Sequence, residues 1–250
     1  MESVTKTPET MSDEAASIGD GNYGQGEENS QGCGAKGKIL GALLAVGGIA
    51  AAAAAYAKVI RPWHLTWGAT DEEAKEAMPG DELIIGARSI THAITVEASA
   101  DTIWPFLTEL GENRGGVYHL TWLENVIDAD IATVESGEPQ WQDLNVGDVV
   151  SIHGNYPPAP VVSMEAKRSL VLGIDLGTEK AATWSILLHP YKLAGQENVE
   201  HTRLIIRFRE REKSGLEKVV DVVANEPVQF VIERKMLLTL KKLAEDAEKA

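Results

Sequence analysis

Cysteine is almost absent from this sequence, and its scarcity excludes two kinds of support for a fold. The one cysteine, Cys33, lies in a Gly-Cys-Gly stretch in the N-terminal part of the chain. A single cysteine can form neither an intramolecular disulfide nor a cysteine-based metal site. Packing and polar contacts must therefore hold the fold.

An excess of positive charge is also missing. The sequence holds 23 lysine and arginine residues against 38 aspartate and glutamate residues, which gives a formal net charge of −15. Proteins that bind nucleic acids neutralise phosphates with clustered basic side chains. Nucleic acid is therefore excluded as a partner.

Catalytic and cofactor motifs are missing as well. The sequence contains no G-x-S-x-G nucleophile motif, no H-E-x-x-H zinc motif and no phosphate-binding loop. We therefore expect no metal and no cofactor, and a binding protein is favoured over an enzyme. Catalysis without such a motif would need a titratable group inside a pocket. The weak catalytic candidates are Tyr118, His119 and His153, and the other titratable groups considered are His92, Asp175 and Glu233.

Long hydrophobic runs are limited to one. Residues 39–57 carry no charge, and the run reaches Ile60 if the aliphatic part of Lys58 lies along the lipid. This length is close to the ~20 residues that span a bilayer core. The Arg-Pro pair that follows should end the helix, and the two tryptophans within residues 61–67 are typical of a membrane interface. The sequence predicts one transmembrane helix over residues 38–60, and hence a single-pass membrane protein.

Two other interpretations of this run stay open. A cleaved signal peptide is supported by Lys36 and Lys38 ahead of the run and by its A-x-A-like end at residues 55–57. A helix packed in soluble protein is supported by the many alanines and glycines, which contribute little to insertion. Basic residues are balanced on the two sides, so the side of the membrane that the globular domain faces is not set. Small residues four apart, such as Gly41 and Ala45, permit weak self-association.

Composition divides the chain into four parts. Residues 1–37 are acidic and rich in serine and glycine, so we expect a disordered tail. The transmembrane helix, residues 38–60, leads into a juxtamembrane linker, residues 61–87. There Thr70 and the three acidic residues after it predict a short, capped helix. Residues 88–250 are long enough for one ligand-binding domain with a sizeable core.

Alternation of apolar and polar residues predicts most elements of this domain. It predicts strands over residues 88–97, 149–153, 161–166, 170–175, 182–191 and 202–210. Ser99 should begin a helix that Gly111 ends, and a second short helix should follow a Gly-Gly pair within residues 114–127. After Pro227, apolar residues recur every three or four positions, which predicts a long amphipathic C-terminal helix. A run of arginines in and after the last strand could attract anionic headgroups, but a solvated strand face is favoured for it: Arg203, Arg207, Arg209 and Arg211.

The order of these elements indicates an α+β fold, and six stretches of the chain resemble the SRPBCC superfamily. They are RPWHLTWGATDEE (Arg61–Glu73), PGDEL (Pro79–Leu83), IWPFLTELG (Ile103–Gly111), RGGVYHLTWLENV (Arg114–Val126), WQDLNVGDVV (Trp141–Val150) and EPVQFVIERKMLLTLKKLAE (Glu226–Glu245). This superfamily shares the helix-grip fold of START lipid-transfer domains, plant pollen-allergen proteins and polyketide cyclases. The chain is most similar to an uncharacterised, membrane-anchored branch from bacteria and archaea. The resemblance implies a curved antiparallel sheet wrapped around a long C-terminal helix.

Such folds leave an apolar cavity between sheet and helix, so the resemblance implies a site for a hydrophobic small molecule or lipid. The expected lining is Trp104, Tyr118, Trp122, Met164, Trp184, Phe230 and Met236. Plain core packing is the alternative for each of them. The leading hypothesis is a membrane-tethered binding protein whose partners are a hydrophobic ligand and the membrane. A cyclase or aromatase acting on a polyketide-like substrate is one alternative, and a non-catalytic scaffold with a filled core is another.

Overall fold

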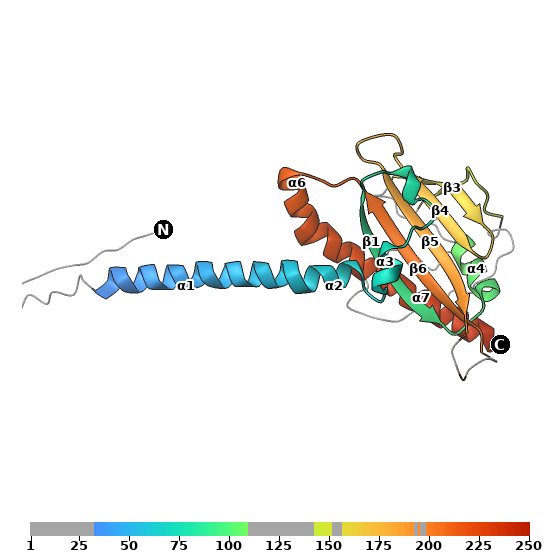
Figure 1. Ribbon diagram of the computed structural model, residues 1–250, viewed down its shortest axis with the longest axis horizontal. Helices are drawn as coiled ribbons and strands as arrows, with labels where there is room; N and C mark the ends of the chain where they lie inside the picture. Colours follow the sequence, from blue (N-terminus) through green and yellow to red (C-terminus); the bar gives the residue numbers. More distant parts are fainter. Residues whose placement is uncertain (1–32, 110–142, 152–156, 193–194, 196–198) are drawn as a thin grey trace, which may run out of the picture. The chain divides into compact units, whose positions relative to one another are not determined.

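A computed structural model describes residues 33–109, 143–151, 157–192, 195 and 199–250 (Figure 1). The chain divides into two compact units, Met1–Ala52 and Ala53–Ala250. Residues 61–87, expected to form a linker, therefore lie within the second unit.

The apolar run is helical. Helix α1 (Cys33–Ala55) continues through a π-helical turn, η1 (Tyr56–Ile60), into the short helix α2 (Arg61–Leu65). The helix does not end at Pro62 as expected, because this proline lies in the first turn of α2, where a missing N–H is tolerated. The stretch Leu44–Leu65 is long and apolar enough to cross a membrane by length and composition alone.

Six strands form one antiparallel sheet in the order β1-β6-β5-β4-β3-β2 (Figure 1). They are β1 (Arg88–Val96), β2 (Val149–Val150), β3 (Ala159–Glu165), β4 (Ser169–Ile174), β5 (Ala182–Tyr191) and β6 (His201–Glu210). All neighbouring pairs run antiparallel. The predicted strands are confirmed, although β2 is shorter than expected.

The inner face of the sheet forms the main core together with two helices. Helix α4 (Ala100–Thr108), capped by Ser99 as predicted, and helix α7 (Glu226–Glu248) both contribute to this core. Its fully buried members include Ile186 of β5, Ile206 of β6 and Leu240 of α7. Burying such a side chain stabilises the fold by about 1.5–3 kcal/mol. The α+β class, with a curved antiparallel sheet and a long C-terminal helix, is confirmed (Figure 1).

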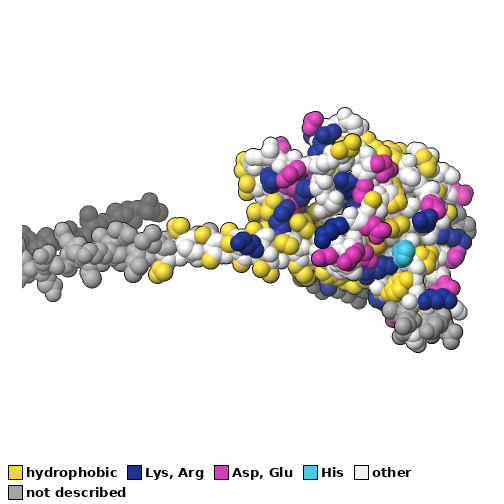
Figure 2. Space-filling model, in the orientation of Figure 1, with side chains coloured by type: hydrophobic (Ala, Val, Ile, Leu, Met, Phe, Trp, Pro, Cys, Tyr) yellow, Lys and Arg dark blue, Asp and Glu magenta, His cyan; other side chains and the backbone are white. Residues whose placement is uncertain are grey.

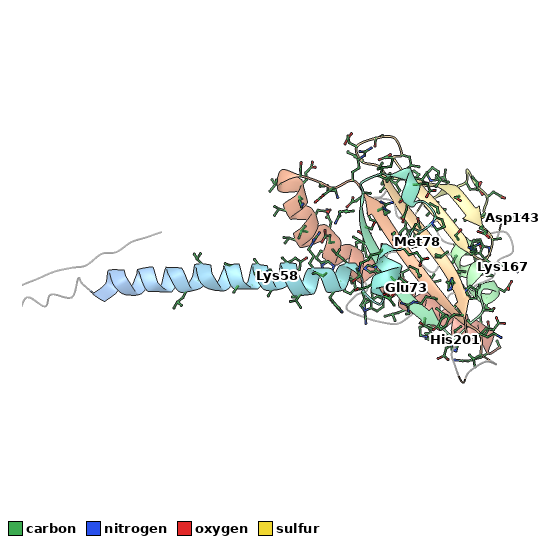
Figure 3. The ribbon with its side chains drawn as sticks, viewed as in Figure 1. Lys58, Glu73, Met78, Asp143, Lys167 and His201 are labelled. Atoms are coloured by element: carbon green, nitrogen blue, oxygen red, sulfur yellow. The ribbon has the colours of Figure 1, made fainter. Side chains whose placement is uncertain are left out.

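The outer face of the sheet is covered by residues 66–83. This segment contains α3 (Asp71–Lys75) and the 3-10 turn η2 (Asp81–Leu83). The predicted capping box is present, because the backbone N–H groups of Thr70 and Glu73 each donate to the other residue's side chain, at 2.8 and 3.1 Å. Met78 is buried on this face against Ala93 of β1 (Figure 3). The outer face thus has a small apolar core of its own.

The C-terminal helical segment is interrupted just before Pro227. Helix α6 (Gly215–Val220) passes through a π-helical turn, η4 (Asp221–Asn225), into α7, which has Pro227 in its first turn. In a π-helical turn the carbonyl of Val222 would accept from residue 227, and proline has no N–H to donate. The hydroxyl of Tyr56 donates to that carbonyl instead, at 2.6 Å. The carbonyl that the interruption leaves without an intrahelical donor therefore accepts the hydrogen bond that joins η1 to η4.

Candidate functional site

Four of the predicted ligand-binding residues belong to one apolar layer on the inner face. Trp184 of β5 and Met236 of α7 are buried in the main core, and Trp104 of α4 and Met164 of β3 pack against it while half-buried. Phe230 lies instead beside Trp63, His64, Trp67 and His92, with ring centroids 5.3–6.2 Å away. Tyr118 and Trp122 lie outside the described residues, as do the catalytic candidates His119 and His153.

Trp184 carries an unusual polar group in this apolar layer. Its side chain lies between Leu172 of β4 and Phe208 of β6 in the strand register, and the residue is only 7% exposed. The indole N–H is buried and has no hydrogen-bond partner among the residues that the structure describes. Buried indole N–H groups usually find an acceptor. The layer therefore offers one free donor among hydrophobic side chains.

A second polar feature links the inner face to α7 and α2. His92 Nδ1 lies 2.6 Å from a carboxylate oxygen of Glu233, and Nε2 lies 2.7 Å from the backbone carbonyl of His64. The amide of Gln229 donates to the second oxygen of Glu233 at 2.9 Å. Both atoms that face the His92 ring are oxygens, so the geometry fits a ring that donates from both nitrogens, as an imidazolium does. His92 therefore has no free nitrogen for a substrate.

The electrostatics of this pair agree with its geometry. Burial by itself lowers the pKa of His92, but the hydrogen bond and negative charge of Glu233, helped by the His64 carbonyl, outweigh it and raise that pKa. A raised pKa favours the charged form of the ring over the neutral form. The pair is thus a buried ionic contact that fixes α7 against β1.

A cluster of charges surrounds Glu226 at the start of α7. Arg61 of α2 donates to both of its carboxylate oxygens, at 2.8 Å each, and Arg88 of β1 also donates to it. Arg88 extends the cluster to Asp221 and Glu210. Bidentate arginine contacts of this kind fix orientation as well as charge. The cluster ties α2, β1 and η4 together at one end of the sheet.

Lysine completes this cluster. Lys213 donates to Asp221 at 2.7 Å. Burial alone would raise the pKa of Asp221, but the hydrogen bond from Lys213 and the charge of Arg88 lower it overall. Asp221 is therefore ionised at neutral pH and contributes to the attraction.

The arginines of β6 are paired rather than solvated, which corrects the expectation for this face. Arg203 binds Glu73 at 2.7 Å, and Arg207 binds Asp81 at 2.6 Å. Arg207 is only 2% exposed and also donates to the backbone carbonyls of Glu73 and Glu76. The alternation of apolar and polar residues along β6 correctly identified the face that points away from the main core. It carries no information about residues 66–83, which cover that face. Figure 2 shows acidic and basic side chains interleaved over the exposed side of the molecule.

A shallow depression of about 360 Å³ lies on this outer face, and its lining residues are Thr70, Glu73, Thr95, His189, Tyr191 and Arg203. The hydrogen bond from Arg203 is the main reason that the pKa of Glu73 is lowered. Glu73 and Arg203, the acidic and the basic residue of this lining, are therefore paired with each other. Within the described part of the chain, no group of three or more His, Cys, Asp or Glu side chains could hold a metal ion.

No protein-family profile matches this chain, and no curated protein matches it. Among solved structures, CalU16 from Micromonospora echinospora is 17% identical, with a TM-score of 0.34 over 65% of this chain and 87% of that one. A truncated norcoclaurine synthase from Thalictrum flavum is 14% identical, with a TM-score of 0.33 over 63% of this chain and 92% of that one. A Staphylococcus aureus protein of unknown function is 10% identical, with a TM-score of 0.36 over 67% and 100%. Likenesses at this level carry no argument about function, so the function must be argued from this chain's own residues.

Proposed function

We propose that this chain is a membrane-tethered binding protein for a hydrophobic small molecule or lipid, held between the inner face of the sheet and the C-terminal helix. The observation that carries the proposal is the unpartnered N–H of Trp184 within an apolar layer. Leaving a buried donor unsatisfied costs about 1–3 kcal/mol. An oxygen atom of a bound molecule would remove that penalty, while the rest of the molecule would contact apolar side chains.

The side chains around Trp184 support this ligand class. Trp104, Met164 and Phe208 pack against the core but stay half-buried, so apolar surface is left for further contact. The ligand we propose therefore has an apolar body and one oxygen acceptor, as a fatty acid or an isoprenoid alcohol has.

The apolar helix supports the tether. Leu44–Leu65 meets the length and composition of a membrane span, and Trp63 near its end is exposed, as interfacial tryptophans are. A binding domain held beside a bilayer meets lipid at a high effective concentration. Tethering would therefore promote the binding of lipid at the apolar site.

The test is native mass spectrometry of the full chain released from lipid nanodiscs, with extraction of any bound molecule. We expect an apolar molecule in stoichiometric amount. Trp184→Phe keeps the ring but removes the N–H, and we expect it to weaken oleate binding about tenfold, equivalent to about 1.4 kcal/mol. Trp63→Phe, which changes an exposed tryptophan, is the matched control and should bind normally. The proposal is wrong if no apolar molecule is retained and neither oleate nor farnesol raises the unfolding temperature.

A further inference from the structure

Helix α6 and the turn η4 expose an apolar stripe. Leu216, Val219, Val220 and Val223 are 77%, 56%, 49% and 66% exposed. Their spacing of three, one and three places them on one side of the helix. A stripe with this spacing usually faces a protein core. Here it faces away from the protein, and Figure 2 shows hydrophobic side chains reaching the surface in this region.

The opposite side of the same helix is polar. Asp221 is buried, where it binds Arg88 and Lys213, and Lys218 binds Glu212. The buried contacts of Asp221 thus hold the helix to the domain and leave the apolar side free. One apolar and one charged face is the pattern of helices that lie in a membrane interface.

Two polar contacts fix this helix to the end of the apolar span. Tyr56 of η1 donates to the carbonyl of Val222 in η4, and Arg61 pairs with Glu226 immediately after η4. Val59 and Ile60, between those two anchoring residues, are exposed. The stripe is therefore held at the level of the last turns of the helix that we propose crosses the membrane.

From these contacts we infer a second membrane contact, which rests on the proposed tether: the stripe Leu216, Val219, Val220 and Val223 lies in the interfacial zone of the leaflet where the apolar helix ends. The domain is then held to the bilayer by two elements rather than one. A flexible tether would let the domain turn, whereas two contacts fix the side of the domain that faces the lipid.

The test measures lipid contact at single positions of the full chain. The substitution Cys33→Ser first removes the native cysteine. Each variant then receives one new cysteine, which is labelled with the fluorophore NBD. The four variants are Val223→Cys, Val59→Cys, Lys218→Cys and Val199→Cys. The proteins are placed in nanodiscs of phosphatidylcholine and phosphatidylglycerol, with and without lipids that carry a nitroxide quencher on the upper acyl chain. All four sites are exposed, so the substitutions leave the core unchanged.

We expect strong loss of fluorescence at Val223 and Val59 and little at the two controls. Lys218 lies on the charged side of the same helix, and Val199 lies just before β6, at the end of the sheet far from α6. Quenching at Val59 with none at Val223 would overturn the second contact and leave the tether standing. No quenching at either site would overturn both. A label at Val223 that neither lipid nitroxide nor aqueous iodide quenches would also overturn the inference, because a second protein copy would then cover the stripe.

Discussion

Replacing Glu233 with glutamine tests the buried ionic pair between α7 and β1. The substitution keeps the shape of the side chain and removes the negative charge that faces His92 at 2.6 Å. Hydrogen bonds to charged groups contribute about 1.5–3 kcal/mol. We expect Glu233→Gln to lower the free energy of unfolding by about that amount at a pH where His92 is protonated in both states, below about pH 6.

The loss should depend on pH in a defined direction. The folded-state pKa of His92 is raised above its unfolded value, so its contribution to stability is fully present below the unfolded pKa. That contribution is lost as the pH rises through the folded pKa, at about 1.4 kcal/mol for each unit between the two pKa values. The difference in stability between the parent chain and the variant should therefore shrink from about pH 6 upward.

Urea unfolding of the full chain in nanodiscs, followed by tryptophan fluorescence across this pH range, measures the difference. Asp246→Asn is the matched control, because it converts an exposed carboxylate on the same helix to an amide. Other titrating groups cancel between the parent and variant curves. A loss that is the same at low and high pH would refute the assignment of His92 as an imidazolium held by Glu233.

Two further substitutions, each with a matched control, test a close backbone contact and a hydrogen bond by the same unfolding assay. Gly80→Ala should destabilise the fold by about 3 kcal/mol, because its φ is +92° and the new Cβ would lie 2.6 Å from a valine methyl. Gly86→Ala, with φ +71° and open space, should cost only about 1 kcal/mol, and equal losses would contradict the close packing. Tyr56→Phe should cost about 1–2 kcal/mol, because it leaves the η4 carbonyl unsatisfied. Tyr191→Phe removes a hydroxyl that bonds another side chain, and it should cost less.

Local patterns in the sequence predict the elements of this fold well. Strands such as β5 and β6 alternate apolar and polar residues because one face forms the core, and that alternation is visible without a structure. Thr70 and Ser99 cap helices because their side chains accept from backbone N–H groups three residues on, a purely local interaction. Pro227 interrupts the C-terminal helix because it lacks an N–H. Each of these features depends on a few consecutive residues.

The polar contacts that organise the site depend on residues far apart in the chain. His92 and Glu233 are separated by 141 positions, and Arg61 and Glu226 by 165. No local pattern pairs them, because tertiary packing brings α7 against β1 and α2. His92 and Glu233 could each be identified as titratable, but their pairing could not be predicted. From the sequence, Arg61 could be interpreted only as part of the Arg-Pro pair that was expected to end a helix.

The segment that covers the outer face supports a last prediction about where the folded domain begins. Residues 66–78 supply backbone acceptors that the sheet needs: Trp67 accepts from the N–H of Ala93 on the edge strand β1, at 3.1 Å. Glu73 and Glu76 provide carbonyls for the buried guanidinium of Arg207. A chain that starts at Pro79 loses all three acceptors.

Such a truncated chain should be much less stable than one that keeps this segment. Without the two carbonyls, Arg207 keeps Asp81 and Thr91 but has unsatisfied N–H groups. An unsatisfied buried group costs about 1–3 kcal/mol, and more when it is charged. Exposing Ala93 and Ile205 by removing Met78 adds to the loss. We therefore expect residues 79–250 to unfold at a clearly lower urea concentration than residues 53–250, or to fail to fold. Equal midpoints for the two chains would mean that the segment lies on the sheet without stabilising it, and that the domain is complete from Pro79 onward.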